Sequence, residues 1–181
     1  AMQKVCPITP NQDGAETPAY VYSHYFLGRR ATALARIDLL NKLSQNFDVT
    51  VYTHADCKDI LPTAIYGGKI DYYDTMPTVF QHSKINLNIT LKTIQTGIPL
   101  RAWDILGCSG FLLTNFQQEL CDFFIPGEDF VYYESPADAI EKAAYFLSHD
   151  RERQEIAHNA FEKIAASHTF HHRVQSMFDI I

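Results

Sequence analysis

The sequence predicts an α/β domain with a Rossmann-like, three-layer αβα architecture, in which helices cover both faces of a mostly parallel sheet. Two observations support this prediction. Short tracts of strand-forming residues alternate with tracts whose apolar residues recur at helical spacing. The clearest strand tract, 111–114, is short and almost wholly apolar, as expected for a strand buried inside a parallel sheet. From this alternation we expect about five or six strands.

The first expected element is a strand at 21–26, where the tract VYSHYF is rich in β-branched and aromatic residues. A helix at 31–45 and a second strand at 48–52 follow. This strand–helix–strand order predicts a parallel pair joined by a right-handed crossover. Next we expect a turn at 66–68 and a short strand at 69–72.

The same alternation continues to the end of the chain. A helix should begin near Met76, with Pro77 in its first turn. The later tracts predict strands at 85–89, 111–114 and 130–133, a helix at 100–106, and two long helices in the C-terminal third. Ser135 followed by Pro136 predicts the capped start of the first long helix.

The chain divides into two parts by composition. Residues 1–18 contain three prolines, an asparagine and a glycine, and are expected to form a linker or a disordered lead-in. Residues 19–181 are expected to form the domain itself. The opening residues Ala1 and Met2 resemble the remnant of a tag, so we expect the chain to be a domain of a larger protein.

Composition excludes several classes of protein. The net charge of −6 argues against a nucleic-acid-binding surface, which needs an excess of basic residues. The four cysteines show no CxxC spacing, so no zinc site is expected. No run of 18 apolar residues predicts a membrane span, and no signal segment opens the chain. We therefore expect a cytoplasmic protein.

Candidate binding residues follow from the expected topology, because open parallel sheets bind ligands at the carboxyl ends of their strands. Gly28, Arg29 and Arg30 come directly after the first expected strand. Glycine permits close approach of the backbone, and arginine binds phosphate through two parallel hydrogen bonds. The alternative, a solvated start of the following helix, has about the same weight.

A second candidate is the segment 95–101, which joins an expected strand to an expected helix. Thr96, Gly97 and Ile98 would place free backbone N–H groups at the start of that helix, where an anion is favoured. Asp104, one turn into the helix, can accept hydrogen bonds from both hydroxyls of a ribose. The alternative is that Asp104 complements the helix dipole and that Arg101 pairs at the surface.

The histidines His168, His171 and His172 are close enough in sequence to suggest a metal site. No acidic or cysteine cluster accompanies them, so no metal and no resident cofactor is expected.

Several motifs, in this order, resemble the C-terminal domain of the spore-maturation CgeB-like glycosyltransferases, which are similar to group 1 glycosyltransferases of the GT-B fold. The resemblance covers about residues 20–178. The motifs are GRR at 28–30, IDYYDTMP at 70–77, SKINLNIT at 83–90, GIPLRAWDILG at 97–107, LLTN at 112–115 and HTFHHR at 168–173.

The resemblance implies a function. In a GT-B enzyme the C-terminal domain binds the nucleotide-sugar donor as a substrate, without a metal, and the N-terminal domain of the same polypeptide holds the acceptor. Group 1 enzymes carry a Glu-x7-Glu motif, whose second acid binds ribose. Asp104 matches that acid, whereas Thr96 stands in the place of the first acid. Arg29 or Arg30, together with Lys84, resembles the basic residues that hold the diphosphate.

Two other classes remain open at this point. The first is a non-catalytic nucleotide-binding or regulatory module of the same fold, which the loss of the first acid favours. The second is a receiver-like, flavodoxin-type signalling domain, which needs an acidic cluster after its first strand. Glycine and arginines occupy that position here. The main hypothesis is a hexosyltransferase-type domain that is inactive in isolation.

Overall fold

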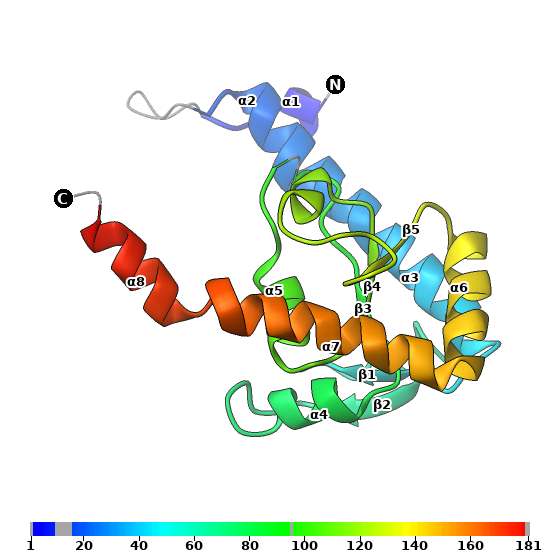
Figure 1. The fold of residues 1–181 in the computed structure, drawn as a ribbon. Coiled ribbons are helices and arrows are strands. Elements are labelled where there is room, and N and C mark those ends of the chain that lie inside the picture. The colour runs from blue at the N-terminus through cyan, green and yellow to red at the C-terminus, as the bar shows by residue number, and fades with distance from the viewer. Residues whose placement is uncertain (1, 10–15, 95, 180–181) are drawn as a thin grey trace.

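All strands in the described part of the chain pair in parallel. The structure is a computed structural model that describes residues 2–9, 16–94 and 96–179 (Figure 1). Its strands are β1 (Thr50–Tyr52), β2 (Ile65–Gly68), β3 (Asn86–Asn88), β4 (Leu112–Asn115) and β5 (Val131–Tyr133). They form a two-stranded sheet, β1-β2, and a three-stranded sheet in the order β3-β4-β5. The predicted α/β class is confirmed.

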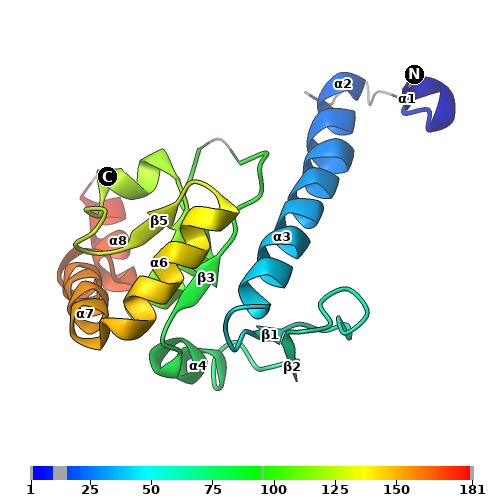
Figure 2. The same ribbon diagram turned by 90° about the vertical axis from the view of Figure 1, so that its right-hand side faces the viewer.

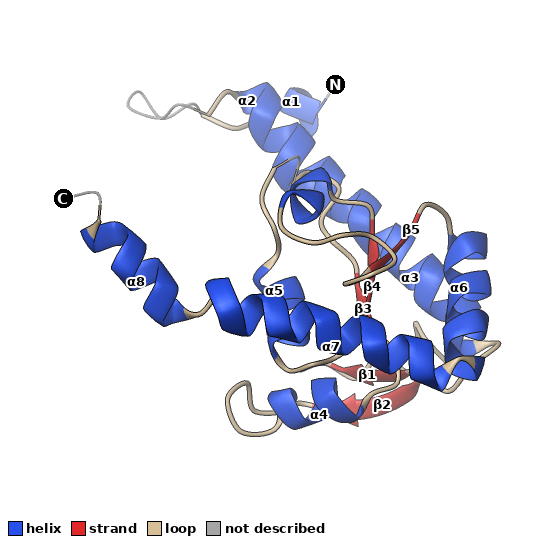
Figure 3. Ribbon diagram, in the orientation of Figure 1, coloured by secondary structure: helices blue, strands red, loops and turns tan. Residues whose placement is uncertain are grey.

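Helices make up most of the regular structure (Figure 3). They are α1 (Met2–Val5), α2 (Pro18–Val21), the π-helix η1 (Tyr22–Gly28), α3 (Arg29–Ser44), α4 (Met76–His82), α5 (Leu100–Gly107), the 3₁₀-helix η2 (Gln118–Asp122), α6 (Pro136–Ser148), α7 (Asp150–Ser167) and α8 (Phe170–Phe178). The helices α2, η1 and α3 follow one another without a break and form one long rod (Figure 2). None of the helices in the described ranges is both long enough and apolar enough to cross a bilayer.

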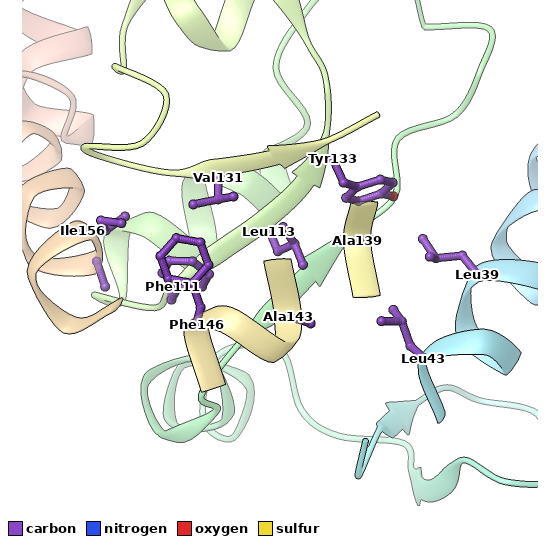
Figure 4. Packing of buried hydrophobic residues seen from close by; sticks show 11 residues of the cluster. Leu39, Leu43, Phe111, Leu113, Val131, Tyr133, Ala139, Ala143, Phe146 and Ile156 are labelled. Carbon is purple, nitrogen blue, oxygen red and sulfur yellow. The ribbon is translucent and has the colours of Figure 1, made fainter. Parts of the chain in front are cut away.

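The three-stranded sheet has helices on both faces, which is the predicted Rossmann-like arrangement. On one face a core cluster joins α3, the sheet, α6 and the N-terminal half of α7 (Figure 4). In this cluster Leu39 of α3 and Phe146 of α6 share a core with Leu113 of β4. On the other face, Leu112 of β4 packs with α5, η2 and α7. Adjacent residues of β4 thus enter opposite cores, because side chains alternate along a strand.

The prediction of a strand at 21–26 was wrong, because this tract is helical. The helix starts at Pro18 and is capped by Thr17, whose side chain accepts a hydrogen bond from the Tyr20 N–H at 3.2 Å. Rings four residues apart then meet along the helix, and Tyr20 stacks on His24 at 3.9 Å between centroids. The strand–helix–strand unit expected at 21–52 is therefore absent. Within the described residues, the first strand along the chain is β1.

The expected turn at 66–68 and strand at 69–72 were also wrong. The strand β2 includes Gly67 and ends at Gly68, whose φ of 74° belongs to the left-handed region. A side chain at Gly67 would overlap the ring of Tyr52 in β1, so glycine permits this pairing. The remaining expected elements are present within a few residues of their predicted ends. Ser135 caps α6 by accepting the Asp138 N–H at 3.1 Å, as predicted.

Candidate functional site

A wide groove of about 1380 Å³ lies between the two sheets, bordered by β1 on one side and β3 on the other. Its charged lining is mostly basic. Four cationic side chains, from α3, the segment after β2, the segment before β3 and α5, line it: Arg36, Lys69, Lys84 and Arg101. Among the residues that the structure describes, Asp48 supplies the only carboxylate of this lining. In a chain with a net charge of −6, this groove is a local concentration of positive charge.

The groove cations are available to a ligand. All four side chains are exposed. None of the four forms an ion pair with a carboxylate within the ranges that the structure describes. Arg36 donates a hydrogen bond to the Ile89 carbonyl at 2.9 Å, which fixes it beside the end of β3. An anion with two or more oxygens suits such a set of unpaired cations.

Arg101 is held in place by α4. Its guanidinium lies 5.4 Å from the centre of the Phe80 ring and contacts the sulfur of Met76. Arg101 is the second residue of α5, so its charge lies at the N-terminal end of that helix. The helix dipole and the guanidinium both favour a negative group there.

Asp104 lies one turn further along α5 and is half-buried. Its carboxylate accepts the hydroxyl of Tyr72 on both oxygens, at 2.9 Å to Oδ1 and 2.8 Å to Oδ2. This hydrogen bond raises the pKa of the Tyr72 phenol above its ordinary value. Sequence reasoning did not select Tyr72, although it belongs to the IDYYDTMP motif.

The segment before α5 also has an acidic partner. Gly97 has a φ of 98°, and its backbone N–H donates to the carboxylate of Glu119 in η2. The amide that was expected to bind an anion therefore binds a side chain of the protein itself. Thr96 and Ile98 flank this contact, and Gln95 lies outside the described residues. Glu119 was not selected from the sequence, because its approach to Gly97 depends on the fold.

A buried polar network shapes the loop that leaves β3. Asn88 donates to Thr90 at 3.1 Å and to Thr114 at 3.0 Å, and the Thr90 N–H donates to Asn115 at 2.8 Å. These groups lie where β3 and β4 end. The network ties the two strand ends together and so directs the chain toward Gly97 and α5.

Gly28, Arg29 and Arg30 do not form the expected loop after a strand. They lie where η1 continues into α3, and none of them lines the groove. A side chain at Gly28 would overlap Thr93, so glycine allows the helix to pack closely on the loop after β3. Arg29 lies 5.3 Å from the centre of the Tyr25 ring. The structure therefore brings Lys84 and Arg101 to the groove and leaves these three residues outside its lining. The other predicted residues, Thr96, Gly97, Ile98 and Asp104, also lie outside the lining, beside Arg101.

The C-terminal histidines have packing roles. His168 lies against the rings of Trp103 and Phe124, at 5.3 and 6.1 Å between centroids. Burial lowers the pKa of His168, and the charge of Arg173 lowers it further. His172 completes a capping box with Thr169 at the start of α8. In the described parts of the chain, no group of three or more metal-ligating side chains is close enough to hold an ion.

The parallel α/β layers and the basic groove together define a Rossmann-like domain suited to an anionic ligand. A family model described as Glycosyl transferase-like matches residues 29–179, which is most of the chain. The chain therefore belongs to the Glycosyl transferase-like family, and glycosyl transfer is its general function. A search of curated proteins found no match.

Proposed function

We propose that this chain is the donor-binding domain of a glycosyltransferase and that the groove between the two sheets holds a nucleotide sugar. The observation that supports this most strongly is the set of four exposed cationic side chains that line the groove of an acidic chain. A sugar nucleotide carries its negative charge on a diphosphate, which requires such a cluster. The helix α5 supplies Arg101 to the groove and places Asp104 a turn away.

In this proposal the residues have distinct roles. Arg101, Lys84 and Lys69 neutralise the diphosphate, whose negative charge increases as the bond to the sugar breaks. Asp104 accepts the hydroxyls of the ribose. The turn at Thr96, Gly97 and Ile98 precedes α5, where backbone N–H groups favour an anion, although Glu119 holds the Gly97 N–H in the free protein. Gly28, Arg29 and Arg30 remain candidates only as residues beside the loop after β3.

The proposal extends to the larger protein. We infer that this chain is the C-terminal half of a GT-B enzyme of the CgeB-like group. The acceptor is then held by an N-terminal domain of the same polypeptide, so the isolated domain binds the donor without transferring a hexose. No metal or cofactor is required, because arginine, lysine and backbone amides supply the positive charge. We also expect a cytoplasmic location.

A second candidate function is a non-catalytic nucleotide-binding module. The observation that favours it is Thr96, which stands where the resemblance places the first acid of the Glu-x7-Glu motif. A transfer or hydrolysis assay with sugar nucleotides on the full-length protein separates the two. Turnover supports the enzyme, and donor binding without turnover supports the module.

Calorimetry with UDP, GDP and TDP tests donor binding by this chain, in buffer with and without EDTA. We expect binding that chelation does not change. We also expect Arg101→Ala to weaken it at least tenfold, about the effect of one lost charge-assisted contact. Arg151→Ala is the matched control, because Arg151 is an exposed arginine on α7 outside the groove. Equal losses in both variants, or loss of binding on chelation, would contradict the proposal.

A further inference from the structure

Tyr72 and Asp104 make a contact that the proposed function does not use. Tyr72 lies in the loop between β2 and α4, and Asp104 lies in α5. The tyrosine has one hydroxyl hydrogen, yet its oxygen is almost equally far from both carboxylate oxygens, at 2.9 and 2.8 Å. The hydroxyl therefore lies between the two oxygens. It occupies the position that a ligand would need in order to bind both carboxylate oxygens.

A vicinal diol needs the same position. Its two hydroxyls can each donate to one oxygen of a carboxylate, which forms a bidentate contact. The tyrosine hydroxyl and the diol cannot occupy the space between the two oxygens together. Tyr72 is 42% exposed, and its ring packs edge-on against Tyr73, so solvent surrounds much of the residue. It can thus leave Asp104 without disturbing the core.

We propose that Tyr72 and Asp104 form a diol-selective site, in which Tyr72 holds Asp104 in the free protein and only a ligand with a vicinal diol gains by displacing it. Displacement breaks one O–H···O⁻ hydrogen bond. A ribose replaces it with two, which is a net gain, whereas a 2′-deoxyribose replaces it with one, which is none. The site therefore favours ribonucleoside diphosphates over their 2′-deoxy counterparts. This inference rests on the proposed function.

The charge state of the pair supports this role. The hydrogen bond to Asp104 raises the pKa of Tyr72, so the phenol keeps its proton at neutral pH and continues to donate. The charge of Arg101 acts on the pKa of the phenol in the opposite direction and less strongly. Asp104→Asn should therefore lower the pKa of Tyr72, measured by ultraviolet titration against a Tyr72→Phe reference.

The first test compares Tyr72→Phe with the wild type in calorimetric titrations of UDP and of inorganic pyrophosphate. Removing the hydroxyl removes the competitor, so UDP should bind about threefold to tenfold more tightly, the effect of one net hydrogen bond. Pyrophosphate has no diol, and its binding should not change. Tyr73→Phe is the matched control and should change neither affinity. Tyr73 is 83% exposed, and the variant keeps the ring that contacts Tyr72.

The second test uses 2′-deoxyuridine diphosphate. In the wild type, Asp104→Ala should weaken UDP binding and leave the deoxy ligand unchanged. In the Tyr72→Phe background it should weaken both, because even one hydroxyl then gains from Asp104. Unchanged or weaker UDP binding by Tyr72→Phe would overturn the diol-selective site alone. Failure of every variant to bind UDP or pyrophosphate would overturn the proposed function as well.

Discussion

Asp104 is a half-buried carboxylate on α5, and the neighbouring residues of that helix, not Asp104, pack in the core. Ala102, Ile105 and Leu106 are buried in the core below the helix. The Asp104 carboxylate points instead to Tyr72 in the loop after β2. A change at Asp104 should therefore alter ligand binding and leave the packing of α5 in place.

Asp104→Ala should lower the affinity for UDP about tenfold. Two hydrogen bonds to the ribose are lost, each about 1.5–3 kcal/mol before screening by water, and the wild type gives up one bond from Tyr72 to gain them. The melting temperature should shift by only a few degrees, about the effect of 1 kcal/mol. Calorimetry measures the change in UDP affinity, and thermal melts measure the change in stability. Unchanged affinity with a large loss of stability would show that Asp104 is structural.

Asp129 is the opposite case, a carboxylate whose role is stability. It is 1% exposed, accepts the Ile125 N–H at 2.6 Å and pairs with Lys163 of α7. Asp129→Asn should reduce the free energy of unfolding by about 1.5–3 kcal/mol, because a charged hydrogen-bond acceptor is removed from a buried site. Urea denaturation measures this loss. The control Asp38→Asn breaks an exposed pair with Lys42 and should cost no more than about 0.5 kcal/mol.

The rod formed by α2, η1 and α3 shows where sequence patterns mislead. The tract VYSHYF has high strand propensity, but such propensity depends on context. The stronger local signal was the cap, because Thr17 followed by Pro18 is typical of a helix start. Strands at 85–89, 111–114 and 130–133 could be predicted, because burial in a parallel sheet leaves an apolar tract or a regular alternation.

Gly28→Ala should destabilise the contact between this rod and the loop after β3. Alanine normally stabilises a helix relative to glycine by about 0.5–1 kcal/mol. Here the new methyl group overlaps Thr93 Cγ2, and overpacking costs about 1–3 kcal/mol. The double variant Gly28→Ala, Thr93→Ser removes that methyl and should recover the lost stability in urea denaturation. No recovery would mean that Gly28 is required for another reason.

The junction of α7 and α8 should respond to pH through His168. Burial against Trp103 and Phe124 lowers its pKa below 6.5, so the unfolded chain binds the proton more readily. Stability should therefore be fully present above about pH 6.5 and fall as the pH drops toward the pKa of the folded state. Nearby Arg173 and His172 act in the same direction. In thermal melts, His168→Phe should lose this pH dependence. An unchanged dependence of the melting temperature on pH would mean that another group causes it.

The groove is a property of the whole chain, and the sequence revealed only part of it. Lys84 and Arg101 could be selected because they lie in segments with recognisable motifs. Arg36 and Lys69 could not be selected. They come near Lys84 and Arg101 only when α3, β1 and β2 fold opposite β3. Which strands pair, and which edges stay apart, depends on long-range contacts that local periodicity does not contain.

The central claim is that the groove between the sheets binds a nucleoside diphosphate. It is tested most directly by titrating UDP into ¹⁵N-labelled chain and following the amide resonances by NMR. We expect saturable shifts at Lys84 and Arg101 in the groove, and at Tyr72 and Asp104 beside Arg101, without a metal. Residues 174–178 of α8, outside the groove, should not move. No saturable shifts, or shifts confined to residues away from the groove, would contradict the claim.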